Sequence, residues 1–484
     1  MINWRIILKI IGSLLFIEAF FMACCMAMAM SFHEDDTIAF AVSTLLTFGA
    51  AFVFLLFGRE AENLLSRRDA YVVVTLTWVV FSFFGMFPFL IHGSMTSIAD
   101  AYFETMSGFT TTGATVIDDV ESLPHGLLFW RSLMQWIGGL GIVFFTIAVL
   151  PSLVGGSVKV FAAEATGPMR SKMHPRLSTS AKWIWSIYLM LTVLCALSFW
   201  LAGMDWFGAT NYSMSTTATG GFSIHNGTIF LASPTVEYLA ILFQFLAGIN
   251  FTLLYVSLFK FRLGALFRNS EFKMYIFAIV VATIWIMYLL ITRLDYHFEP
   301  AFRSALFQVV SFITTTGLSD TDAGAWPHLT WIILMFLMFM GASAGSTTGG
   351  FKCIRVLMLL KVLRNEFRHV LHPNAVLPVK VSGQSIPQNR LVTLLAFLTL
   401  YIIMLLTVTA VFHVLGVDLT NAMTISLSLV SNVGAGLDTN IGPQMSWSEL
   451  SSGVKWLCSF LMLVGRLEII AVLVLFTRSF WKEN

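Results

Sequence analysis

The chain has 484 residues, of which 57% are hydrophobic and only 11% are charged. Soluble domains contain about 25% charged residues, so this composition excludes a soluble globular protein. Together with 45 Phe and 14 Trp residues, it indicates a polytopic membrane protein. The net charge of +2 says little about partners, and we expect no nucleic acid among them.

Runs of about 20 apolar residues predict ten membrane-spanning helices. The first two, at residues 4–30 and 37–57, form the expected N-terminal section 1–69. A signal peptide is the alternative for the first run, because Arg5 and Lys9 precede or open it. The run is longer than the apolar region of a signal peptide, so we expect a retained helix.

One short motif recurs four times in the remainder of the chain, at a spacing of roughly 100 residues. It reads Thr110-Thr111-Thr112-Gly113, Thr217-Ala218-Thr219-Gly220, Thr314-Thr315-Thr316-Gly317 and, in degenerate form, Ser431-Asn432-Val433-Gly434. Each copy ends a segment that is too short to cross a bilayer, and a long apolar stretch follows it. The recurrence indicates a protein built from repeats.

We therefore predict four units, each with a spanning helix, a short re-entrant segment that contains the motif, and a second spanning helix. The units cover residues 70–160, 180–265, 272–370 and 388–484. Their first helices are expected at residues 71–92, 183–203, 274–293 and 391–415, and their second helices at 126–150, 235–259, 330–363 and 454–480. The expected fold is an all-α polytopic membrane protein with four parallel repeats in a pseudo-fourfold arrangement around one pore.

Basic residues gather in the segments that join one unit to the next and near both termini. The positive-inside rule places these segments, with the N- and C-termini, in the cytoplasm. The motif segments are then reached from outside, with Asp118, Asp119 and Asp320 beside them. Units of one orientation can surround a central axis, whereas the inverted repeats of many carriers alternate in orientation.

The motif chemistry suits a cation. Irregular backbone at membrane depth is tolerated only where protein buries it or where it lines a water-filled path. Extended Thr-Gly segments can turn carbonyl oxygens toward a common axis and replace a cation's hydration shell. Thr and Gly also pack between membrane helices, but four copies in equivalent units favour a filter. We predict a cation bound by backbone carbonyls only, at Thr110, Thr111, Thr112, Gly113, Ala218, Thr219, Gly220, Thr315, Thr316, Gly317, Asn432, Val433 and Gly434.

The second helix of the third unit contains a glycine-rich interruption. The residues singled out there are Gly341, Gly345, Ser346, Thr347, Thr348, Gly349 and Gly350. Each glycine weakens a helix by about 1 kcal/mol, and the hydroxyl residues suit a polar path, so an unwound loop is favoured. The alternative is a helix packing face, because three of the glycines are spaced by four residues.

Arg466 lies within an apolar span, between Val464 and Leu467. Charges within the membrane are costly and usually face an interior or an aqueous cavity. One hypothesis is a positive barrier in the pore beneath the filter. The alternatives are an ion pair with Glu468 or another acid, and an arginine near a helix end that reaches the interface.

These motifs resemble those of the Trk/Ktr/HKT superfamily of potassium transporters, and most of all the membrane subunit of bacterial Trk systems. The resemblance covers the whole chain and includes residues 110–114, 217–222, 314–318, 341–352, 431–436 and 465–469. It implies K+ selectivity, since members that pass Na+ tend to have serine where this chain has Gly113. The fourth filter departs most from the pattern, at Asn432 and Val433, which implies an asymmetric ring.

The resemblance further implies that the glycine-rich interruption lies across the pore below the filter and is its gate, and that Arg466 lowers cation flux. It implies a homodimer in the lipid of the bacterial cytoplasmic (inner) membrane, with a cytosolic nucleotide-binding regulatory ring (TrkA-like). Any nucleotide binds that ring, and we expect no cofactor in this chain.

The leading hypothesis is K+ uptake through a gated, K+-selective pore driven by the electrochemical gradient. The chain has no P-loop for ATP chemistry, and we expect no enzyme activity. A stoichiometric K+/H+ or K+/Na+ symporter is the alternative within transport. A non-conducting membrane scaffold or sensor is the alternative from another class.

Overall fold

The computed structural model describes residues 2–61, 65–139, 141, 177–227, 233–262, 264–375, 377–437 and 446–482. Within these residues the regular secondary structure is helical apart from one antiparallel hairpin, in which β1 (Lys380–Val381) pairs with β2 (Gln384–Ser385).

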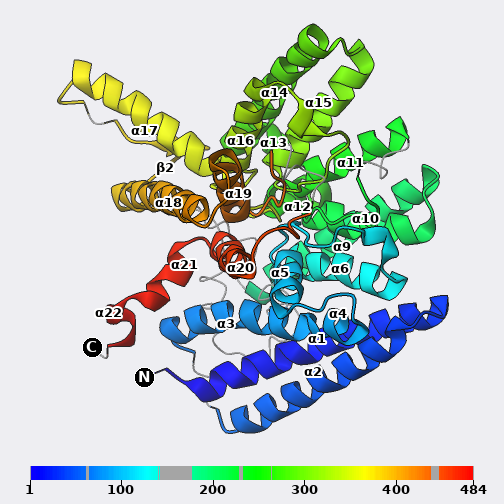
Figure 1. The fold of residues 1–484 in the computed structure, drawn as a ribbon. Helices are drawn as coiled ribbons and strands as arrows, with labels where there is room; N and C mark the ends of the chain where they lie inside the picture. The colour runs from blue at the N-terminus through cyan, green and yellow to red at the C-terminus, as the bar shows by residue number, and fades with distance from the viewer. Residues whose placement is uncertain are drawn as a thin grey trace.

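The two ends of the described chain meet at one corner of the molecule (Figure 1). The Asn3 N–H donates to Asp69 Oδ1 at 3.0 Å, and Arg68 donates to the Lys482 carbonyl at 2.8 Å. Both termini therefore lie beside the start of the same helix, α3 (Arg67–Gly85).

Helices α1 (Trp4–Phe32) and α2 (Asp36–Gly58) pack against each other along one edge of the molecule (Figure 1). They approach closely because the last residue of α2 has no side chain. A Cβ on Gly58 would lie 2.7 Å from the backbone nitrogen of Lys9. Small residues permit this approach between membrane helices.

The α1–α2 pair also caps α6 (His125–Gly139), a helix that reaches the centre of the molecule. The Glu34 carboxylate accepts a hydrogen bond from the His125 N–H at 2.6 Å. The Asp36 carboxylate accepts from the Leu127 N–H at 3.1 Å. These bonds satisfy first-turn N–H groups that have no partner within the helix itself.

In the rest of the chain, each of the four predicted units begins with a long helix that is followed by a short one. The long ones are α3, which α4 (Phe87–His92) follows, α9 (Leu177–Leu201), α14 (Ser270–Leu294) and α18 (Gln388–Val414). The short ones that precede the motif residues are α5 (Ile98–Phe109), α10 (Trp206–Ala218), α15 (Phe298–Ile313) and α19 (Leu419–Ser431). At about 1.5 Å rise per residue, helices of this length are shorter than the roughly 30 Å hydrocarbon core, so they do not span it.

After each motif the chain returns through further helices. In addition to α6, they are α11 (Pro234–Ala247), α12 (Phe251–Phe259), α16 (His328–Met340), α17 (Cys353–Leu371), α20 (Ser452–Arg466) and α21 (Ile470–Leu473). Short turns complete the described chain: η1 (Val120–Ser122), α13 (Gly264–Arg268), η3 (Ala323–Ala325), η4 (Val474–Phe476) and α22 (Arg478–Trp481).

Six helices of the described chain are long and apolar enough to cross a membrane, and two bent pairs bring the number to as many as eight. Two of the ten predicted spans need separate comment. The span predicted at 126–150 extends beyond the described residues, and α6 is the part of it that the structure describes. The end of the unit predicted at 70–160 also lies outside the described residues. The span predicted at 330–363 is interrupted.

Two second helices that we expected to be continuous are broken. The chain bends by 103° between α11 and α12 and by 109° after α20. At the first break, the Asn250 side chain accepts from the Leu253 N–H and so begins a new helix. At the second, Glu468 and Ile469 have φ of 55° and 29°, which an α-helix does not allow. The predictions of continuous helices at 235–259 and 454–480 are therefore wrong.

The interruption predicted in the third unit is confirmed. Helix α16 ends at Met340, an irregular segment follows, and α17 begins at Cys353. We call residues 341–352 the intramembrane loop. The alternative of a continuous helical packing face is wrong, because three glycines of this loop have φ between 62° and 76°. Helix α17 then projects away from the other helices (Figure 1).

We predict that Gly58→Ala destabilises the protein and that Gly49→Ala does not. Both glycines lie on α2, but a Cβ at Gly49 would meet no atom within 4 Å. Overpacking costs about 1–3 kcal/mol, whereas alanine at an open helical position gains up to about 1 kcal/mol. Thermal unfolding in detergent measures the difference, and equal midpoints for the two variants would contradict the close α1–α2 contact.

Candidate functional site

Each short helix ends in an irregular segment, and we call residues 110–113, 218–221, 314–317 and 431–434 the four motif loops. One residue in each has a left-handed φ between 52° and 55°, namely Thr111, Thr219, Thr315 and Asn432. Two residues later each loop has a glycine with φ between 74° and 86°, namely Gly113, Gly221, Gly317 and Gly434. Threonine rarely adopts this conformation, which persists only where the surrounding structure enforces it.

The second motif loop lies one residue later in the chain than its motif predicts. Its left-handed glycine is Gly221, whereas Gly220 occupies the position between the two left-handed residues. Ala218 is the last residue of α10. The predicted segment Ala218-Thr219-Gly220 is therefore corrected to Thr219-Gly220-Gly221.

Backbone hydrogen bonds support this register and show a signal that the sequence analysis missed. The residue before each motif glycine donates its N–H, at 2.8–2.9 Å, to a serine carbonyl in its own short helix. The donors are Thr112, Gly220, Thr316 and Val433, and the acceptors are Ser107, Ser215, Ser311 and Ser428. A serine therefore precedes each true motif glycine by six residues, and this spacing selects Gly221 from the sequence alone.

The four motif loops contact one another in a closed cycle. A Cβ added at any motif glycine would overlap a carbonyl oxygen of the neighbouring loop. The pairs are Gly113 with Gly220, Gly221 with Thr316, Gly317 with Val433, and Gly434 with Thr112. The first loop thus meets the second, the second the third, the third the fourth, and the fourth the first. Glycine is required because any side chain would separate neighbouring loops.

All four motif glycines line one open hollow, together with Asp118. The Asp118 carboxylate accepts hydrogen bonds from the hydroxyls of Ser446 and, at 2.6 Å, Ser448. These bonds lower the pKa of Asp118 below its ordinary value. Asp118 is therefore ionised at neutral pH and gives the hollow a negative charge beside the loops.

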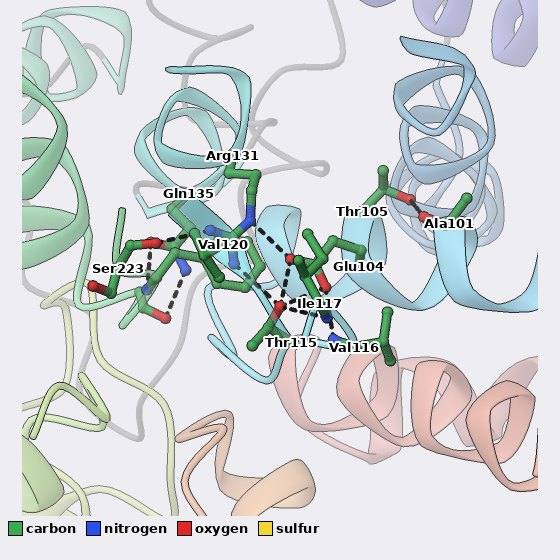
Figure 2. Close-up of polar contacts among 12 residues, drawn as sticks. Ala101, Glu104, Thr105, Thr115, Val116, Ile117, Val120, Arg131, Gln135 and Ser223 are labelled. Atoms are coloured by element: carbon green, nitrogen blue, oxygen red, sulfur yellow. Dashed lines mark hydrogen bonds and ion pairs between the residues drawn. The ribbon is translucent and has the colours of Figure 1, made fainter. Parts of the chain in front are cut away.

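A buried ion pair ties α6 to the short helix α5 (Figure 2). Arg131 Nε lies 2.9 Å from Glu104 Oε1, and both side chains are at most 2% exposed. Arg131 also donates to the Ser223 carbonyl at 2.8 Å, and its guanidinium lies 4.2 Å from the centre of the Phe222 ring. Either charge would be costly to leave buried alone, so Arg131 is held in place and joins α5 to the segment that follows the second motif loop.

Gln135 lies one helical turn after Arg131 and binds the second loop directly (Figure 2). Its Nε2 donates to the Gly220 carbonyl at 2.7 Å, and its Oε1 accepts from the Phe222 N–H at 3.2 Å. The sequence analysis missed both residues. A charged residue and an amide spaced by four positions in a mostly apolar helix are the signal that identifies them.

The intramembrane loop lies against the other side of the motif loops. Thr347 Oγ1 lies 3.3 Å from the Thr217 carbonyl at the end of α10. The Gly349 N–H donates to Thr315 Oγ1 at 2.7 Å, and a Cβ on Gly349 would overlap the Ser431 carbonyl. The loop therefore contacts the second, third and fourth motif regions.

The intramembrane loop also exchanges backbone hydrogen bonds with the break between α11 and α12. The Ser343 N–H donates to the Gly248 carbonyl at 3.1 Å, and the Phe251 N–H donates to the Gly345 carbonyl at 3.0 Å. The break between the two helices and the intramembrane loop thus each provide hydrogen-bond partners for backbone N–H and carbonyl groups that have none within a helix.

Polar side chains of the intramembrane loop bind one another. Ser346 Oγ and Thr348 Oγ1 lie 2.8 Å apart. The buried Lys352 ammonium donates to the Thr348 carbonyl and hydroxyl. These bonds hold the loop in one compact conformation.

Arg466, at the end of α20, joins three distant segments. Its guanidinium donates to the carbonyls of Gly138 and Gly139 at 2.6 and 2.8 Å. It also donates to Thr111 Oγ1 and to the Thr347 carbonyl, each at 3.0 Å. Arg466 therefore connects α6, the first motif loop and the intramembrane loop.

The apolar spans define a multi-pass membrane protein, in which short helices and irregular loops meet at the centre. Irregular backbone of this kind at membrane depth is typical of proteins that pass ions.

Comparison with known proteins gives the family. The family model for TrkH, a cation transport protein, matches residues 38–483. The Trk system potassium uptake protein TrkH of Halomonas elongata is 36% identical, with 99% of each chain covered. The protein of the same name in Escherichia coli is 34% identical over 99% of this chain and all of its own. The crystal structure of the potassium transporter TrkH from Vibrio parahaemolyticus matches with a TM-score of 0.89 and 33% identity, over 99% of this chain and 100% of that one.

The chain therefore belongs to the TrkH family of cation transport proteins, which are transporters and not enzymes. The resemblance inferred from the motifs is confirmed.

We predict that Gly221→Ala lowers cation uptake at least about tenfold and that Gly220→Ala is less harmful. Alanine at position 221 must adopt a φ of 86° and overlap the Thr316 carbonyl, whereas position 220 needs no left-handed φ and its Cβ meets the Gln135 side chain rather than the backbone of another loop. The backbone strain alone is worth about 1–3 kcal/mol. Rubidium tracer uptake in cells, normalised to the amount of protein in the membrane, measures both variants. A larger defect in Gly220→Ala would contradict the corrected register.

Proposed function

We propose that this protein is the membrane subunit of a Trk-type system and takes up K+ through a gated, K+-selective pore in the bacterial inner membrane. The observation that carries the proposal is the closed cycle of four motif loops, each glycine against a carbonyl of the next loop. The relatives from Halomonas elongata and Escherichia coli, similar over the full chain, are potassium uptake proteins.

The proposed selectivity filter consists of the four motif loops, which add Gly221, Thr314 and Ser431 to the predicted residues. A K+ ion that enters must lose hydration water, and the backbone carbonyl oxygens of the loops replace it. The short helices direct their C-terminal ends, which are partly negative, toward the loops and favour a cation there. The ionised Asp118 attracts cations to the hollow that leads to the filter.

The proposed pseudo-fourfold arrangement of parallel repeats is supported by what the loops share. Each loop follows its short helix with the same order of left-handed residues and the same serine spacing. All four glycines line the same hollow. Four loops that share this geometry and line one hollow are the expected result of four units with one orientation.

We propose the intramembrane loop as the gate, since it contacts three motif regions and is bound to the first through Arg466. Its irregular backbone allows a change of conformation that a packed helix does not. The Arg466 guanidinium adds a positive charge next to the proposed path, which opposes cation entry.

The membrane potential supplies the proposed driving force, at about 2.3 kcal/mol per elementary charge for 100 mV. We place both termini in the cytoplasm, which the distribution of basic residues supports. The proposed partners are a second copy of this chain, a cytosolic TrkA-like ring that binds the regulatory nucleotide, and the surrounding lipid. Membership of the relatives in Trk systems supports the ring.

The direct test is ion flux into liposomes that contain the purified chain, with and without its regulatory ring. We expect K+ flux that exceeds Na+ flux, and a reversal potential that does not follow an imposed pH gradient. Gly113→Ser should lower the K+/Na+ ratio about tenfold, because a side chain at φ 83° overlaps the Gly220 carbonyl and separates two loops. Absence of flux under every condition would refute the pore.

We predict that Arg466→Ala raises K+ flux per molecule. At an effective dielectric constant of about 20 and a separation of roughly 8 Å, one like charge costs a cation about 2 kcal/mol, or roughly thirtyfold in occupancy. Arg466→Lys is the matched control, because it keeps the charge and loses the multiple hydrogen bonds of the guanidinium. Single-channel recording distinguishes the two. Unchanged conductance in Arg466→Ala would contradict the barrier.

A further inference from the structure

The corrected register aligns the four short helices position by position. Nine residues before the motif glycine, the aligned residues are Glu104, Tyr212, Gln308 and Ile425. Two residues after the motif glycine, they are Thr115, Ser223, Ser319 and Gly436. All four helix residues are at most 1% exposed. The polar side chains among them, those of Glu104, Tyr212 and Gln308, therefore need partners within the protein.

In the first three units these two positions are bonded to each other. The Thr115 hydroxyl lies 3.0 Å from both carboxylate oxygens of Glu104 (Figure 2). The Tyr212 and Ser223 hydroxyls lie 2.9 Å apart. The second of these bonds has a defined direction, because the Ser223 hydroxyl donates to the His225 carbonyl and must accept from Tyr212.

The third unit makes the same bond with an amide. Gln308 Nε2 donates to the Ser319 hydroxyl at 2.5 Å and to Asp320 Oδ1 at 3.0 Å. Three different side chains, a carboxylate, a phenol and an amide, thus hold the segment just beyond the motif glycine to its own short helix. The residue types differ among the three units, so the repeated bond reflects the equivalent positions of these residues in the structure.

The fourth unit lacks the chemistry for this bond, since Ile425 has no polar side-chain atom and Gly436 has no side chain. The fourth motif loop is instead hydrogen-bonded to the first motif loop. Asn432 Nδ2 donates to Thr112 Oγ1 at 3.0 Å, and beyond the fourth loop the Trp447 N–H donates to the Thr115 carbonyl at 2.7 Å.

We propose that Glu104, Tyr212 and Gln308 are positioning residues that set ion selectivity, each by fixing the outer end of its own motif loop. The inference rests on the proposed K+ pore. A loop whose outer end is fixed keeps its carbonyl oxygens at the separation that suits K+. A released loop lets those oxygens close around the smaller Na+.

The experiment measures K+/Na+ permeability ratios from reversal potentials of the full chain in liposomes with its regulatory ring. Tyr212→Phe removes one hydroxyl and keeps the ring, and Ser319→Ala removes the other end of a different tether. Loss of one buried hydrogen bond should lower the ratio about fivefold in each. Ser319→Thr, which keeps the hydroxyl, should restore the wild-type ratio. Ile425→Val, at the aligned position of the fourth unit, is the matched control and should leave the ratio unchanged.

The outcomes separate the two proposals. Wild-type ratios in Tyr212→Phe and Ser319→Ala, with selective K+ flux intact, would overturn the tethers and leave the pore standing. An equal loss in Ile425→Val would show that these positions act through general packing, which also overturns the inference. No flux from the wild-type chain would refute the pore itself. Ser223→Ala tests the second tether from its loop side if Tyr212→Phe fails to fold.

Discussion

Backbone groups at membrane depth must find partners, and this requirement organises the centre of the molecule. In each motif loop the N–H before the glycine donates to a serine carbonyl of its own short helix, and a carbonyl of the loop lies against the glycine of a neighbour. Displacing one loop therefore disturbs both of its neighbours. This mutual dependence is the reason that Thr111, Thr219, Thr315 and Asn432 keep left-handed conformations that cost about 1–3 kcal/mol each.

Side chains from the second helices support the ring from two sides. On one side, Arg131 binds Glu104 of α5 and the Ser223 carbonyl beyond the second loop, and Gln135 binds the Gly220 carbonyl of the second loop. On the other, Arg466 binds Thr111 of the first loop and Thr347 of the intramembrane loop. Any displacement of the intramembrane loop must break or rearrange that last bond. The proposed gate and the proposed filter thus share one hydrogen-bonded arginine, which is a physical route for coupling between them.

Much of this could be predicted from local sequence. Hydropathy indicated the membrane spans, and glycine content indicated the interruption at residues 341–352, because both act over a few neighbouring residues. The second loop was placed one residue early, since Thr217–Gly220 matches the motif and only the spacing from Ser215 points to Gly221. For Arg466 the sequence left three roles open: a barrier in the pore, an ion pair with Glu468 or another acid, and an arginine that reaches the membrane interface. In the structure Glu468 Oε2 lies 2.6 Å from Arg355.

The amino-acid sequence was sufficient to show that the chain crosses a membrane several times, that a short motif recurs four times, and which family the chain resembles. These properties depend on the composition and order of short segments. Only the tertiary structure shows which loops meet, in what cyclic order, and where the second helices of the second and fourth units break. The break at residues 248–250 is held by the intramembrane loop, and Arg466 is held by carbonyls of α6. Such contacts join segments that are far apart in the chain, so no local pattern specifies them.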